Sequence, residues 1–245
     1  MSDNTQDVQV KGSSVQKPAE TVSFLIENQE IHVNKAILFR KVHRFRGESF
    51  PITLNIDLLS FVAFTIWLHG DILPELNSVY HEEQGHITYF GYDPEALYKF
   101  ATALNLEPLA DNIMDCMRKA HLSVGIGFTK AQIEKIYNDR IIRCGFSLFA
   151  SLWIRLEETR PNNYLKLLTK ADRDELLKNE FIAVDVNLHR QAWFSGNQSR
   201  CRFHLHQFDI GEPCTRTHSI SVRSWVLDKD GSFRELDEWR AQRGY

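Results

Sequence analysis

Hydrophobic and polar positions alternate near the start of the chain, in a pattern typical of paired β-strands. Residues 22–26 are apolar and rich in strand-forming types, a polar turn follows at 28–30, and alternation continues over 31–33. This pattern predicts a β-hairpin. A short helix is predicted over 35–39, and a further strand over 52–56, where the alternation returns.

A helix that is apolar almost all round is predicted next. Asp57 is a suitable N-cap, because its carboxylate can accept hydrogen bonds from the free N–H groups of a first helical turn. Residues 58–69, which follow it, have no charged face. A helix of this kind is expected to be buried or to lie at an interface.

Two linked helices, each with one apolar face, are predicted after a longer connection. The connection covers 70–92 and ends in a short predicted strand. Asp93 and Pro94 are typical of an N-cap and a first helical position. Apolar side chains then recur at helical spacing. They are Leu97, Phe100, Ala101 and Leu104 in the first helix, and Leu109, Ile113 and Met117 in the second.

The pattern changes character in the second half of the chain. Helical periodicity predicts three further helices, over 129–137, 141–157 and 172–184. From about residue 185, aromatic residues, histidines and alternating positions dominate, and they predict strands over 203–208 and 219–227. Short strands and helices in this order indicate an α+β fold.

Composition and charge narrow the classes of function. Apolar residues make up 43% of the chain and charged residues 25%, which is ordinary for a globular protein. A net charge of −3 gives no strong attraction to nucleic acid or to an anionic membrane. The longest apolar run, 58–68, has 11 residues, whereas a membrane-spanning helix needs about 20. We therefore expect neither nucleic acid nor a membrane as a partner.

The first residues indicate where the chain resides. Residues 1–19 are polar and lack the apolar segment of a secretory signal, so we expect a disordered tail and a location in the cytoplasm or nucleus. In these compartments the four cysteines are expected to be reduced thiols.

The first half of the chain resembles the BTB/POZ domain family. The resemblance rests on "VSFLIENQEIHVNKAIL", similar to the opening hairpin and helix of the family, and on "ITLNIDLLSFVAFTIWLHG", similar to its strand and tryptophan-containing helix. "LYKFATALNLEPLADNIMDCM" is similar to its paired helices, and "FTKAQIEKIYNDRIIRCGFSLFASLW" to the helical segment that follows the domain in fungal members. The resemblance implies a protein-interaction module.

Some positions depart from the family pattern. Many members carry Ser-Asp and Val-His-Lys where this chain has Glu20-Thr21 and Val33-Asn34-Lys35. Members that bind cullins carry a hydrophobic-x-Glu motif, and its nearest match here, Phe45-Arg46-Gly47-Glu48, is one residue too long. The resemblance therefore leaves open a role as a ubiquitin-ligase adaptor that binds a cullin.

The aromatic residues of the apolar helix are the candidate interface. If Phe61, Phe64 and Trp67 reach the surface, they form the kind of aromatic patch that protein interfaces favour. The alternative is that all three are core residues.

A cluster of cysteines and histidines near the C-terminus is the candidate metal site. Cys201, His204, His206 and Cys214 could supply a tetrahedral set of ligands for a structural zinc ion. His204 and His206 would lie on the same face of a strand. A similar arrangement occurs in the tails of fungal BTB proteins. The alternative is that these are buried thiols and histidines that are hydrogen-bonded to carbonyl groups.

Motifs of known enzyme classes are scarce, so we expect a non-catalytic protein. The predicted organisation is a tail at 1–19, a BTB/POZ-like domain at 20–122, a helical extension at 123–184 and a β-rich region at 185–245. The expected function is self-association or docking of a protein partner. The competing hypothesis is a metal-dependent enzyme or a metal-stabilised binding domain centred on the C-terminal Cys/His cluster.

Overall fold

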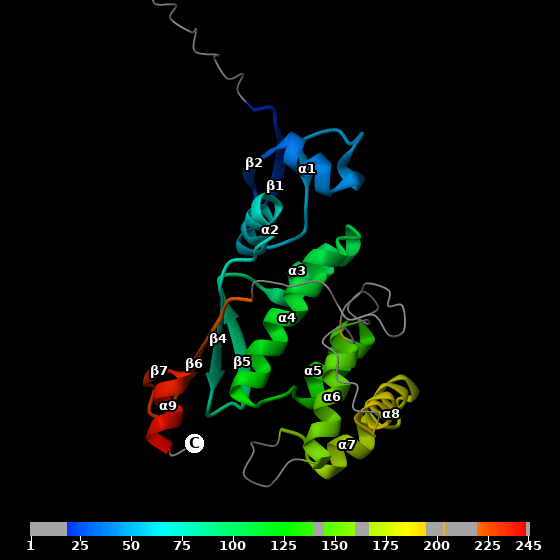
Figure 1. Cartoon of the computed structure of the whole chain (residues 1–245), viewed down its shortest axis with the longest axis vertical. Helices are drawn as coiled ribbons and strands as arrows, with labels where there is room; N and C mark the ends of the chain where they lie inside the picture. Colours follow the sequence, from blue (N-terminus) through cyan, green and yellow to red (C-terminus); the bar gives the residue numbers. More distant parts are fainter. Residues whose placement is uncertain (1–18, 140–144, 160–166, 195–202, 204–219, 244–245) are drawn as a thin grey trace, which may run out of the picture.

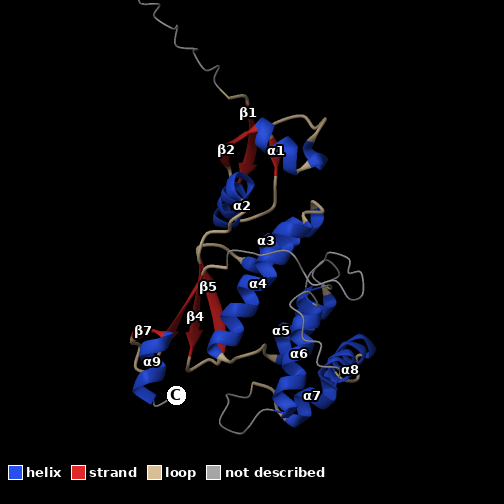
Figure 2. Ribbon diagram, in the orientation of Figure 1, coloured by secondary structure: helices blue, strands red, loops and turns tan. Residues whose placement is uncertain are grey.

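The computed structural model describes residues 19–139, 145–159, 167–194, 203 and 220–243, and it confirms the α+β fold (Figures 1 and 2). The strands of these residues form a three-stranded sheet and a four-stranded sheet. The predicted tail lies outside the described residues, apart from its last position.

The three-stranded sheet has the order β2-β1-β3 and comes from the first part of the chain. Strands β1 (Thr21–Ile26) and β2 (Gln29–Asn34) form the predicted hairpin. Its turn residues Glu27 and Asn28 have φ of 48° and 64°, as a tight hairpin turn requires. Helix α1 (Lys35–Lys41) and a 3₁₀ turn, η1 (His43–Phe45), lead to β3 (Ile52–Thr53), which pairs with β1 in parallel.

Helix α2 (Leu58–Gly70) starts where the sequence predicts, because an Asp57 carboxylate oxygen accepts the Ser60 N–H at 2.8 Å. A connection then forms strand β4 (Leu76–His81) and strand β5 (His86–Phe90), which are antiparallel to each other. The sequence predicts only the second of these strands.

The four-stranded sheet has the order β5-β4-β6-β7 and joins distant parts of the chain. Strand β6 (Val222–Leu227) pairs with β4 in parallel, and β7 (Phe233–Glu235) pairs with β6. Helix α9 (Leu236–Arg243) packs on these last two strands. Strands β6 and β7, from the predicted region 185–245, therefore belong to the same sheet as β4 and β5, from the predicted segment 20–122.

Helices fill the remainder of the described chain. Helices α3 (Pro94–Ala103) and α4 (Glu107–Val124) are the predicted pair, and α4 lies between the four-stranded sheet and the other helices (Figure 1). These are α5 (Lys130–Asn138), α6 (Gly145–Thr159), α7 (Lys170–Leu176) and α8 (Glu180–Phe194).

Two boundaries in the second half differ from the prediction. The single helix expected over 172–184 is two helices, because the Asn179 side chain accepts the Phe181 N–H at 3.0 Å and starts α8 anew. Helix α8 then continues to Phe194, so the first part of the region expected to be β-rich is helical. The strand expected over 203–208 lies outside the described residues except at Phe203.

Candidate functional site

The aromatic residues of α2 lie in the core and not at the surface. Phe61 and Phe64 are 0% exposed and Trp67 is 3% exposed. The Phe61 ring lies 5.3 Å from Phe24, and the Phe64 ring lies 5.1 Å from Phe100. The three rings therefore do not form the expected aromatic surface patch. They are core residues, as the alternative interpretation has it. The physical reason is that the sheet and α3 cover the aromatic side of the helix.

The opposite side of α2 is exposed and aliphatic. Leu59, Val62 and Ile66 are 56%, 39% and 45% exposed. Their spacing of three and four residues places them on one helical face. The helix has no Asp, Glu, Lys or Arg from Leu58 to Gly70. We refer to Leu59, Val62 and Ile66 as the aliphatic face of α2.

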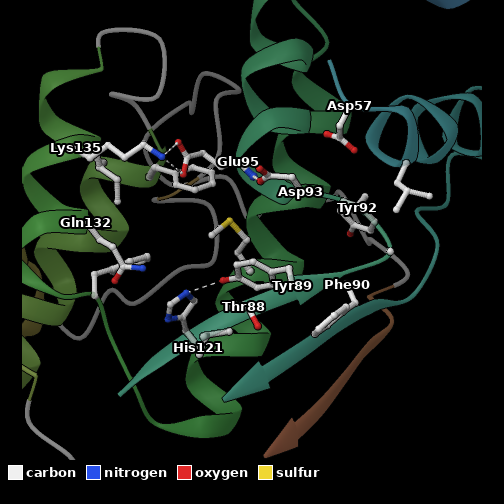
Figure 3. A pocket seen from close by; sticks show the side chains of 17 residues that line it. Asp57, Thr88, Tyr89, Phe90, Tyr92, Asp93, Glu95, His121, Gln132 and Lys135 are labelled. Atoms are coloured by element: carbon white, nitrogen blue, oxygen red, sulfur yellow. Dashed lines mark hydrogen bonds and ion pairs between the residues drawn. The ribbon is translucent and has the colours of Figure 1, made fainter. Parts of the chain in front are cut away.

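A cavity of about 470 Å³ lies between strand β5 and helices α3 to α6 (Figure 3). Its volume falls within the range of roughly 300–1,000 Å³ that is usual for ligand pockets. Buried apolar side chains form much of its wall: Ile87, Met117, Phe128, Ile136 and Phe146.

A hydrogen-bonded pair, His121 and Tyr89, forms one side of the cavity. The His121 Nδ1 lies 2.8 Å from the Ile126 carbonyl oxygen, which can only accept, so Nδ1 carries the proton. The Nε2 atom then accepts the Tyr89 hydroxyl at 2.8 Å. Burial lowers the pKa of His121 from 6.5 to about 4, so its ring is neutral near pH 7. With both ring nitrogens engaged, His121 joins strand β5 to helix α4.

Acidic side chains gather at the other end of the cavity. Glu95 forms ion pairs with Lys99 at 3.1 Å and with Lys135 at 3.0 Å. Asp57 and Asp93 cap α2 and α3, and within the described part of the chain neither has an ion-pair partner. The negative charges of Asp57 and Asp93 at this rim are therefore not neutralised by a basic side chain of the described residues.

The predicted zinc ligands Cys201, His204, His206 and Cys214 lie outside the described residues. Their neighbour Phe203 is buried, with its ring 5.8 Å from Phe149. Within the described ranges, His, Cys, Asp and Glu side chains do not gather in groups of three that could hold a metal ion. Cys116 is a buried thiol, and burial raises its pKa to about 11, which keeps it protonated.

No pattern in the sequence indicates the aliphatic face or the cavity directly. An all-apolar helix indicates an interface or a core but not which side faces which. The cavity residues come from six elements, α2, β5, α3, α4, α5 and α6, and only tertiary packing brings them together.

None of the helices in the described part of the chain has the length and apolar character needed to cross a bilayer. Neither a scan against models of known protein families nor searches of curated proteins and of solved structures find a match for this chain.

Proposed function

We propose that this protein is a non-catalytic interaction module that forms a homodimer through the aliphatic face of α2. The observation that carries the proposal is the exposure of Leu59, Val62 and Ile66 on a helix without Asp, Glu, Lys or Arg. Aliphatic side chains exposed side by side gain free energy when another apolar surface covers them.

The absence of Asp, Glu, Lys and Arg along α2 favours a second copy as the occupant. In a two-fold dimer the same patch meets itself, so any charge in the patch would face a like charge. The cores of interfaces are also poor in charged residues. Helix α8 exposes a comparable apolar row, Phe181, Val184 and Leu188, but the exposed acidic residue Glu180 is next to this row. Self-pairing of α8 would place this carboxylate at the interface.

A BTB/POZ-like arrangement of the first 120 or so residues is part of this proposal. In its support, the structure has a hairpin, a helix, a strand and an apolar helix in the order on which the resemblance rests, followed by the α3–α4 pair. The β4–β5 hairpin is an addition between α2 and α3. In the nearest match to a cullin-binding motif, the Phe45 side chain is buried, with its ring centroid 5.2 Å from that of Phe24. It is therefore not available to a partner. An adaptor role through this motif is therefore not favoured.

A charge placed in the aliphatic face tests the proposal. In Ile66→Asp, two like charges would meet across the dimer, and we expect the dimer dissociation constant to rise by about a hundredfold or more. The matched control is Leu122→Asp, because Leu122 is also aliphatic, helical and 45% exposed. Sedimentation velocity over a range of protein concentrations measures both variants.

Thermal melting of both variants checks that they remain folded. An Ile66→Asp variant that is folded and dimerises as tightly as the Leu122→Asp control would contradict the assignment of this face.

A further inference from the structure

Strand β5 has a free edge in the described structure. It is the outer strand of its sheet, with β4 on one side. Strand β4 directs alternate backbone groups to β6, as the bonds from Leu76 N–H to Ser221 and from Glu82 N–H to Leu227 show. The backbone groups of the intervening odd-numbered residues, Val79 among them, therefore point towards β5. The register pairs Val79 with Thr88. Alternation along β5 then leaves the N–H and C=O groups of Ile87 and Tyr89 directed away from the sheet.

The cavity runs along this edge. Four successive residues of β5, Ile87 to Phe90, line it. Side chains of successive strand residues point to opposite faces of a sheet, so a space that touches all of them must extend along the strand's edge. Within the described ranges, no other segment forms backbone hydrogen bonds with Ile87 or Tyr89.

The surroundings of the edge indicate what could bind there. Apolar side chains such as Met117 and Phe128 also line the cavity, and the carboxylates of Asp57 and Asp93 lie at its rim. Phe90, at the end of β5, is 57% exposed. An occupant must therefore supply backbone hydrogen-bonding groups, an apolar side chain and a positive charge.

We propose that the free edge of β5 binds an extended, basic peptide segment of a partner protein, which adds a strand to the sheet. Backbone bonds to Ile87 and Tyr89 hold the segment, an apolar side chain enters the cavity, and a Lys or Arg side chain pairs with Asp57 and Asp93. This site goes beyond dimerisation through α2, and the two surfaces meet at Leu59, which belongs to the aliphatic face and also lines the cavity.

Selection from a random library supplies the probe, because the natural partner segment is not identified. The full chain would be immobilised and exposed to phage that display random octapeptides. We expect the enriched peptides to alternate apolar residues with Lys or Arg. The best of them would be synthesised with a fluorescent label, and its dissociation constant measured by fluorescence anisotropy.

Two modifications separate strand addition from other kinds of binding. N-methylation of the peptide on alternate residues blocks one edge of a strand, so one of the two methylation registers should weaken binding at least tenfold and the other should not. In the protein, the double variant Asp57→Asn and Asp93→Asn keeps both helix caps, because Asn is also a good N-cap. We expect it to weaken binding roughly tenfold, as the loss of two exposed ion pairs would. The control Asp174→Asn, at an exposed position on α7, should leave binding unchanged.

Three results would overturn the proposal. They are a selection without enrichment, a peptide that tolerates N-methylation in both registers, and equal binding by the double variant and the wild type. None of them bears on dimerisation through α2, which sedimentation reports separately.

Discussion

Replacement of Trp67 by Ala is expected to lower the free energy of unfolding by about 3–5 kcal/mol. The Trp67 side chain is 3% exposed and stacks 6.5 Å from the Phe64 ring. The Lys41 ammonium group lies 4.6 Å from the indole and 3.2 Å from the Trp67 carbonyl oxygen. Removal of the indole leaves a cavity between α1 and α2 and withdraws this cation–π contact. Urea unfolding at one fixed protein concentration measures the loss, because a dimer's stability depends on concentration.

The matched control is Phe181→Ala, because Phe181 is an aromatic helical residue that is 57% exposed. Its replacement is expected to change stability by about 0.5 kcal/mol or less. A Trp67→Ala variant that loses less than about 1 kcal/mol would mean that the indole is not a core residue.

Acid is expected to destabilise the protein through His121. The pKa of His121 is lowered by burial to about 4 in the folded state, against 6.5 for an unperturbed histidine. The unfolded chain therefore binds a proton in this window that the folded chain does not, and stability falls as the pH falls from 6.5 towards 4. The contribution of this one group between pH 6.5 and 4.5 is roughly 2 kcal/mol.

The variant His121→Gln isolates that contribution. It should be less stable than the wild type near pH 7, because the bonds to Tyr89 and Ile126 are altered, but it should lose roughly 2 kcal/mol less on acidification. The control His69→Gln, at an exposed position on α2, should lose as much stability on acidification as the wild type does. Urea unfolding at pH 6.5, 5.5 and 4.5 provides the comparison. Equal pH dependence of His121→Gln and the wild type would show that His121 is not held neutral by burial.

Local patterns predicted the elements that local interactions determine. The first hairpin follows from alternation around a two-residue turn, and the starts of α2 and α3 follow from the capping carboxylates of Asp57 and Asp93. These features depend on contacts within a few residues, which a sequence pattern displays directly.

Features that depend on distant pairings could not be predicted in this way. Strand β6 pairs with β4 across most of the chain, for example Leu76 with Val222, and no periodicity records such a partner. For α2, the pattern indicated a core or an interface, but whether the aromatic or the aliphatic side is exposed depends on the packing of Phe24 and Phe100. The cavity beside Tyr89 and His121 likewise exists only once six elements have packed together.

The most direct test of the proposed function is the mass of the wild-type protein as a function of concentration, measured by sedimentation equilibrium. The chain has a mass of 28.5 kDa. We predict that the average mass rises towards twice that value as the concentration increases through the micromolar range, as reversible pairing of the aliphatic faces requires. A mass that stays at that of one chain up to the highest soluble concentration would contradict dimerisation through α2.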